Sequence, residues 1–179
     1  FVDHIAGLVT RDERSWLLDA VARDAHEWDE WFGRSTDIGG LERERNILRY
    51  RPAPTQVRGC ADAKLVDVAR VVAAGLVAAG DDISVCLDPS FGEGLGRALR
   101  SVGVAVTTAS DEDWYASLGA GRVRLVGGNP SRAADEVDGN PDLVVWANEV
   151  TSAPQIEFLP FLREQSVSVT AHRFGNVDA

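Results

Sequence analysis

A glycine-rich turn is the part of the sequence that comes nearest to a ligand-binding motif. Gly92-Glu93-Gly94-Leu95-Gly96 follows an apolar run at 83–87 and opens a helical pattern, which is where a dinucleotide-binding fold places its pyrophosphate turn. Asp111 stands about 20 residues beyond, where an acid that binds ribose is expected. Because the spacing is Gly-x-Gly-x-Gly rather than Gly-x-Gly-x-x-Gly, a plain turn into a surface helix is the favoured interpretation. Cofactor binding by Gly92, Gly94, Gly96 and Asp111 stays an alternative hypothesis.

The other residue types that could do chemistry are dispersed. The histidines are too far apart in the sequence to indicate a metal site, and neither cysteine belongs to a Cys-x-x-Cys pair. Cys60 and Cys86 fall in apolar strand-like segments, where a thiol usually behaves as a small buried hydrophobe. Asp111 with its acidic neighbours fits equally well in the first turn of a helix. We therefore predict no catalytic residue and no metal ligand.

Strand-like and helical patterns alternate from Asn46 onward. Their order predicts an α/β fold with a Rossmann-like parallel sheet and flanking helices. A strand at 143–146 is apolar on both faces and is predicted to lie in the centre of that sheet. The predicted strands are 55–60, 83–87, 104–107, 122–126 and 142–147, and the predicted helices are 63–79, 94–101, 112–118 and 153–164.

An amphipathic helix is predicted near the N-terminus. Thr10 and Glu13 have the spacing of a capping box, and the apolar positions that follow recur at helical spacing until Gly33. The segment 35–45 is rich in glycine and charge and is predicted to be a connector. The apolar positions of the helix are Leu17, Val21, Ala25, Trp28 and Phe32.

The sequence changes to strict alternation at 166–170. Ser166, Ser168 and Thr170 share one face of an extended chain, while Val167 and Val169 share the other, which is typical of a half-buried strand. Such a strand must pair with a sheet edge of its own domain or reach across to another domain or subunit. We expect the end of the chain to need a partner.

Composition limits the function classes. With 179 residues and a net charge of -10, the chain has the size of one globular domain and repels phosphate backbones, so we expect no nucleic-acid partner. No apolar run approaches the roughly 18 residues needed for a membrane span, so no membrane insertion is expected. The chain lacks a secretory signal, which favours a cytoplasmic location. It starts at Phe1 and contains no Met, so we expect a piece of a longer polypeptide.

The segments 44–52, 71–85 and 159–176 together resemble the C-terminal region of long proline utilization A proteins. Those bifunctional enzymes join an FAD-dependent proline dehydrogenase to an NAD-dependent glutamate-semialdehyde dehydrogenase, and in the longer members a second aldehyde-dehydrogenase-superfamily domain follows. The resemblance covers roughly 42–176. It implies a Rossmann-like domain of that superfamily at 42–158 and a C-terminal helix with a docking strand at 159–179. The residue pattern adds the N-terminal helix and connector at 1–41.

The chain departs from a working aldehyde dehydrogenase at the positions that carry the chemistry. Ala61-Asp62-Ala63 stands where an Asn-Phe-Pro turn holds the oxyanion, and Asp88 stands where a lysine grips the adenosine ribose. Gly127-Gly128-Asn129-Pro130 replaces the usual Gly-Ser loop, and the nucleophilic cysteine is missing. The resemblance therefore implies no cofactor in this chain, with FAD and NAD bound elsewhere in the parent enzyme.

The resemblance implies a noncatalytic structural domain that packs on the catalytic aldehyde dehydrogenase domain of the same polypeptide. Its terminal motif would cover the cavity that carries the semialdehyde between active sites. An autonomous dinucleotide-binding module, a truncated dehydrogenase and self-association through the terminal strand remain as alternatives. The predicted docking tail comprises Ser166, Val167, Ser168, Val169, Thr170, Phe174, Gly175 and Asn176.

Overall fold

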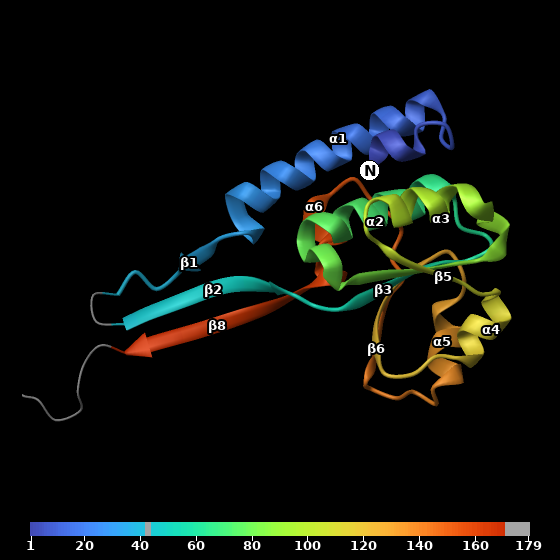
Figure 1. Ribbon diagram of the computed structural model, residues 1–179. Coiled ribbons are helices and arrows are strands. Elements are labelled where there is room, and N and C mark those ends of the chain that lie inside the picture. Colours follow the sequence, from blue (N-terminus) through green and yellow to red (C-terminus); the bar gives the residue numbers. More distant parts are fainter. Residues whose placement is uncertain (42–43, 171–179) are drawn as a thin grey trace, which may run out of the picture.

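A computed structural model describes residues 1–41 and 44–170 and contains two sheets (Figure 1). A five-stranded sheet has the order β5-β4-β3-β6-β7, and every neighbouring pair in it is parallel. A three-stranded antiparallel sheet has the order β1-β2-β8. The predicted α/β fold with a parallel sheet and flanking helices is confirmed. The parallel strands are β3 (Thr55–Gly59), β4 (Ile83–Leu87), β5 (Ala105–Thr108), β6 (Gly121–Val126) and β7 (Leu143–Trp146).

The prediction that 143–146 forms a central strand is wrong, because β7 is an edge strand that pairs only with β6. Its two apolar faces have different uses. Leu143 and Val145 pack against a small cluster on one face of the sheet. On the other face, Trp146 lies under the guanidinium of Arg122, and Val144 is 41% exposed. A strand that is apolar on both faces, such as β7, therefore need not have a neighbouring strand at each edge.

Helices cover the two faces of the parallel sheet unequally (Figure 1). One face lies under α2 (Leu65–Ala79), α3 (Gly92–Ser101) and the N-terminal helix, and the larger apolar core fills the space between them. The other face carries only α4 (Asp111–Ala116) and α5 (Pro130–Glu136) over a smaller core. No helix in the described residues is both long and apolar enough to cross a membrane. Short 3-10 turns lie at η1 (Val2–Ile5), η3 (Gly80–Asp82) and η4 (Pro89–Phe91).

Helix α5 falls where the sequence analysis expected no helix. Its N-terminus has clear local signals, since Asn129 Oδ1 accepts a hydrogen bond from the Ser131 N–H at 3.0 Å and Pro130 occupies the first helical turn. The helix is only 7 residues long, so its apolar periodicity is too short to read.

The N-terminal helix is confirmed as α1 (Arg11–Glu27), which continues into a π-helical turn, η2 (Trp28–Phe32). Both hydrogen bonds of the predicted Thr10 and Glu13 capping box are present. Ala25, predicted to lie on the apolar stripe, is exposed. The buried neighbour is Asp24, which accepts hydrogen bonds of 2.5 and 2.8 Å from the Arg70 guanidinium of α2. This ion pair joins α1 to the main body of the protein.

The antiparallel sheet, which we call the ribbon, projects from one end of the body (Figure 1). It consists of β1 (Ser35–Asp37), β2 (Glu44–Pro52) and β8 (Leu162–Thr170), so the predicted connector at 35–45 is partly strand. The predicted helix at 153–164 is also too long. Only Pro154–Glu157 form an α-helix, α6, and the 3-10 turn η5 (Leu159–Phe161) follows, because Pro160 has no N–H to extend an α-helix.

Candidate functional site

The carboxyl edge of the parallel sheet is where α/β proteins usually bind ligands, at the point where the strand order reverses. Here that point lies between β3 and β6, because the chain runs from β3 to β4 and β5 on one side and then returns to β6 on the other. The loops after β5 and β4 carry Asp111, the residue of the alternative cofactor hypothesis, and Asp88, which stands where the resemblance to aldehyde dehydrogenases implies a lysine.

Arg58 occupies the part of this edge between β4 and the loop that follows β5. It points from β3 with its side chain fully buried, and its Nη2 donates a 2.6 Å hydrogen bond to Asp111 Oδ1. Its Nη1 donates to the Ala109 carbonyl at 3.1 Å and contacts Cys86 Sγ at 3.2 Å. The other oxygen of Asp111 accepts from the Ala61 N–H at 3.2 Å. Asp111 is brought to the carboxyl edge as predicted, and both its oxygens are engaged by this chain.

Asp88 adds a second acid to the same edge. Its Oδ2 lies 3.8 Å from Arg58 Nη2, and its Oδ1 accepts from the Ser90 N–H at 2.9 Å. Burial pushes the pKa of Asp88 up, but the Ser90 hydrogen bonds and the Arg58 charge outweigh it, so the pKa is lowered. Asp88 is therefore a carboxylate at neutral pH.

The two thiols are buried, as predicted. Burial raises the pKa of Cys60 to about 12, and the nearby Asp111 carboxylate adds to the shift. A thiol with so high a pKa is not a nucleophile at neutral pH. Within residues 1–41 and 44–170, no group of three or more His, Cys, Asp or Glu side chains is arranged to hold a metal ion.

The glycine-rich turn serves packing and a sharp change of direction. Gly92 opens α3 with a φ of 64°, and a Cβ at Gly94 would lie 3.0 Å from the Leu8 side chain. The cavity beside the turn measures about 140 Å³ and is lined by Asp88 and Glu93 among others. Ligand pockets for drug-sized molecules typically measure roughly 300–1,000 Å³. The turn lies at the carboxyl edge, beside a small cavity whose charged lining residues are Asp88, Glu93 and Arg100.

A second hollow lies at the reversal of strand order and measures about 540 Å³. Asp62 connects the loop after β3 to the loop after β6, because Asp62 Oδ1 accepts a hydrogen bond from the Gly128 N–H at 2.8 Å. Gly128 has a φ of 70°, and a Cβ there would lie 2.6 Å from Cys60 Sγ. Asp62, Asp67 and Glu149 line the hollow with a single cation, Lys64, so its charge does not favour the phosphates of a dinucleotide.

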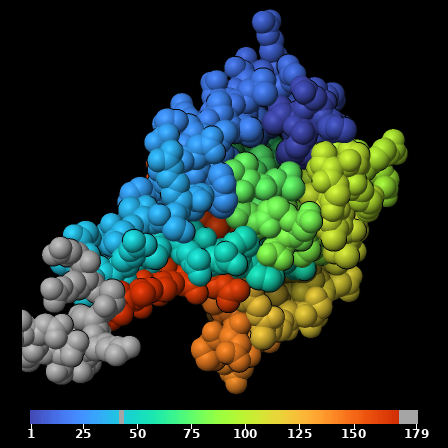
Figure 2. Space-filling model, turned by 60° about the vertical axis from the view of Figure 1, so that its left-hand side comes forward, coloured from blue at the N-terminus to red at the C-terminus, as the bar shows by residue number. Residues whose placement is uncertain are grey.

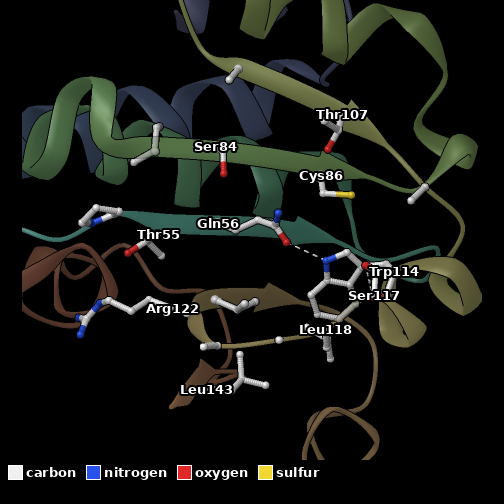
Figure 3. A pocket seen from close by; sticks show the side chains of 18 of the residues that line it. Thr55, Gln56, Ser84, Cys86, Thr107, Trp114, Ser117, Leu118, Arg122 and Leu143 are labelled. Carbon is white, nitrogen blue, oxygen red and sulfur yellow. Dashed lines mark hydrogen bonds between the residues drawn. The ribbon is translucent and has the colours of Figure 1, made fainter. Parts of the chain in front are cut away.

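A third hollow, about 720 Å³, lies where α4 and α5 leave the second face of the sheet uncovered (Figure 3). Small polar side chains of the strands point into it, among them Ser84 and Thr107. Trp114 forms one wall and donates a 2.7 Å hydrogen bond from Nε1 to Gln56 Oε1. Asp81, Asp82 and Arg122 are the charged residues that line it, and no histidine among the described residues does.

The ribbon carries the described part of the predicted docking tail. Ser166 to Thr170 form the end of β8 and pair with β2, so the terminal strand is confirmed and is longer than predicted. Val167 lies opposite Ile47 in register, which places both on one face. On this face Val167 is only half-buried and Val169 is 49% exposed. Phe174, Gly175 and Asn176 lie outside the described residues.

The opposite face of the ribbon turns toward the body. Tyr50 packs against Phe32 with ring centroids 4.9 Å apart, and Leu162 is buried in the main core. Ser168 Oγ donates to Asn46 Oδ1 at 2.7 Å on the same face. The valine face therefore points away from the core of the chain and is available to another surface.

Sequence reasoning missed the residues that occupy the carboxyl edge. Arg58 had one signal, since an arginine inside an apolar strand must find a buried acid. Tyr115 had none: its hydroxyl donates to the Asn129 carbonyl at 3.0 Å and accepts from the Asn129 N–H at 2.7 Å, which connects α4 to the start of α5.

No protein-family model matches the chain, and no curated protein matches it. Among solved structures, proline utilization A from Corynebacterium freiburgense is similar over 93% of this chain and 15% of its own length, with 25% identity and a TM-score of 0.57. Proline utilization A inactivated by N-propargylglycine, from Bdellovibrio bacteriovorus, matches 63% of this chain and 13% of its own length, with 17% identity and a TM-score of 0.48. A mutant of proline utilization A from Bradyrhizobium japonicum matches 82% of this chain and 18% of its own length, also with 17% identity and a TM-score of 0.48.

This chain thus spans less than a fifth of the length of these structures. In fold, it is similar to a segment of proline utilization A.

Proposed function

We propose that the chain is a noncatalytic structural domain of a cytoplasmic, bifunctional enzyme that converts proline to glutamate through pyrroline-5-carboxylate and glutamate semialdehyde. The domain packs its ribbon on the catalytic aldehyde dehydrogenase domain of the same polypeptide and helps to enclose the intermediate. FAD and NAD are bound by other parts of that enzyme. The similarity to proline utilization A over 93% of the chain supports this proposal.

The observation that carries the proposal is the uncovered valine face of a projecting ribbon. Val169 is 49% exposed on a sheet whose opposite face is fixed to the body through Tyr50 and Leu162 (Figure 1). Apolar side chains on a rigid, projecting sheet are typical of surfaces that pack against another protein. Burial of such a face on a neighbouring domain removes apolar area from water and stabilises the contact.

The carboxyl edge supports the noncatalytic part of the proposal. Both oxygens of Asp111 accept hydrogen bonds from Arg58 and the Ala61 amide, and Asp88 adds negative charge where a dinucleotide would bring its own. The alternative of an autonomous dinucleotide-binding module requires Asp111 to be released from a buried arginine, which costs several kcal/mol. Calorimetric titration of the chain with NAD should therefore show no micromolar binding, and saturable binding in that range would favour the alternative.

The docking role is tested with Val169→Asp in the full-length gene product. A carboxylate on the valine face should weaken packing on the neighbouring domain, because a charge would be buried in an apolar contact even though Arg45 lies opposite it in register. We expect more free semialdehyde in the medium, measured with an amine reagent that traps aldehydes, and a longer lag before NADH appears from proline. The rate of proline oxidation itself should not change.

Val144→Asp is the matched control. Val144 is 41% exposed on β7 and lies outside the ribbon, so the same change there should leave the lag and the trapped aldehyde as in the unaltered enzyme. Equal coupling in both variants and the unaltered enzyme would contradict the docking role.

A further inference from the structure

The arginines of the ribbon lie on one face. Arg45 is paired in register with Val169, Arg49 with Gln165 and Arg51 with Arg163, and directly opposed residues of antiparallel strands share a face. The face that presents Val167 and Val169 therefore also carries Arg45, Arg49, Arg51 and Arg163.

The acids of the ribbon are distributed differently. Glu44 pairs with Thr170 and Glu164 with Tyr50, so both carboxylates belong to the opposite face. Asp37 is the only acid of the described strands on the arginine face, and its Oδ1 already accepts from the amides of Gly39, Gly40 and Asn46. In a chain with a net charge of -10, this face has an excess of positive charge.

Two of these arginines oppose each other. Arg51 and Arg163 are direct cross-strand partners at the base of the ribbon, an arrangement that destabilises a sheet because like charges repel. Arg122 lies close by, and burial followed by the charge of Arg163 lowers the pKa of Arg122. Among the described residues, none of the four ribbon arginines forms an ion pair.

We propose that the arginine face of the ribbon is the docking surface for an acidic segment of a protein partner. Carboxylates of that segment bind between Arg51 and Arg163, and its apolar side chains pack on Ile47, Val167 and Val169. This inference rests on the proposed docking function and adds the chemistry of the partner surface, which is acidic around an apolar centre.

The mixture of side chains favours a protein over other anionic partners. Nucleic acid and anionic lipid headgroups are recognised mainly by the density of positive charge, and the net charge of -10 works against both. The apolar residues between the arginines require apolar surface in return. Of the eighteen basic residues only Lys64 is a lysine, and arginine forms the bidentate pairs with carboxylates that protein interfaces prefer.

The test is Arg51→Glu in the full-length gene product, with hydrogen exchange of the β8 amides as the readout. Within the ribbon alone, the new carboxylate would face Arg163 and replace a repulsive pair with an attractive one. A purely structural role therefore predicts slower exchange, whereas docking on an acidic segment predicts exchange faster by about tenfold or more. The opposite signs separate the two explanations.

Three further variants complete the design. Arg51→Lys keeps the charge and should keep most of the protection, and Arg97→Glu, an exposed position on α3, should change nothing in β8. If Val169→Asp speeds exchange in β8 but Arg51→Glu slows it or leaves it unchanged, the acidic partner is refuted and docking stands. If neither variant speeds exchange, both proposals fail. Micromolar binding of a DNA duplex that Arg51→Glu abolishes would also overturn the inference.

Discussion

Removal of Asp24 should destabilise the protein far more than removal of any exposed acid of the same helix. The carboxylate and the Arg70 guanidinium are both fully buried and share hydrogen bonds of 2.5 and 2.8 Å. In Asp24→Ala, Arg70 keeps only its bond from Nε to the Thr151 carbonyl at 3.0 Å and is left as an unpaired buried charge. Breaking a buried pair in this way costs about 3–5 kcal/mol of the free energy of unfolding.

The size of the loss can be checked by urea unfolding followed by tryptophan fluorescence, since Trp28 packs edge-on against Phe158 beside this pair. In thermal unfolding, a loss of 1 kcal/mol lowers the melting temperature of a chain of this size by about 2–4 °C, so the melting temperature of Asp24→Ala should fall by roughly 6–20 °C. Asp19→Ala, an exposed change on the same helix, should stay within about 0.5 kcal/mol of the unaltered chain. The double change Asp24→Leu with Arg70→Met should recover most of the stability, because no charge is then buried. Equal losses for Asp24→Ala and Asp19→Ala would refute the reasoning.

Two other predictions follow from local geometry. Gly128→Ala should lower the free energy of unfolding, measured with urea, by about 2 kcal/mol or more. The new Cβ would lie 2.6 Å from Cys60 Sγ and 2.7 Å from the Tyr115 hydroxyl, at a residue with a left-handed φ of 70°. An unchanged midpoint of urea unfolding would contradict these contacts. The pKa of Asp37 is lowered, first by the hydrogen bond from the Asn46 amide, so the stability it contributes is present above the usual aspartate pKa and is lost as pH falls through the lower folded value. An NMR titration of the Gly39 amide should have its midpoint below about 3.9, and a midpoint at or above that value would argue against it.

The strands of the parallel sheet could be predicted because each is a short apolar run bounded by turn residues. β4 occupies the predicted residues 83–87 without change, since an apolar run between turn residues has few other uses. The ribbon was harder to predict. β2 places Ile47 and Leu48 on opposite faces, and its arginines share the face of Ile47, which the body leaves uncovered. From the sequence alone, such a strand resembles a charged connector.

The candidate site shows the same limit. The sequence predicts that Asp111 follows a strand and stands at the start of a helix, and Asp111 begins α4 after β5, because this position depends only on the order of strands and helices. The arginine that occupies its carboxylate lies 53 residues earlier in the chain, and no local pattern connects the two. Long-range pairs between single polar residues are set by packing in three dimensions, which period and spacing do not encode.

The ribbon pairs two segments that are far apart in the chain, β2 and β8. Arg49 donates from Nε to Gln165 Oε1 at 2.7 Å across 116 residues of sequence, and the two strands lie side by side at the surface (Figure 2). During synthesis, β2 emerges from the ribosome early and must wait with an open edge until β8 follows. Interrupted chains that lack β8 cannot complete this sheet, so the edge of β2 stays unpaired until synthesis has passed residue 170.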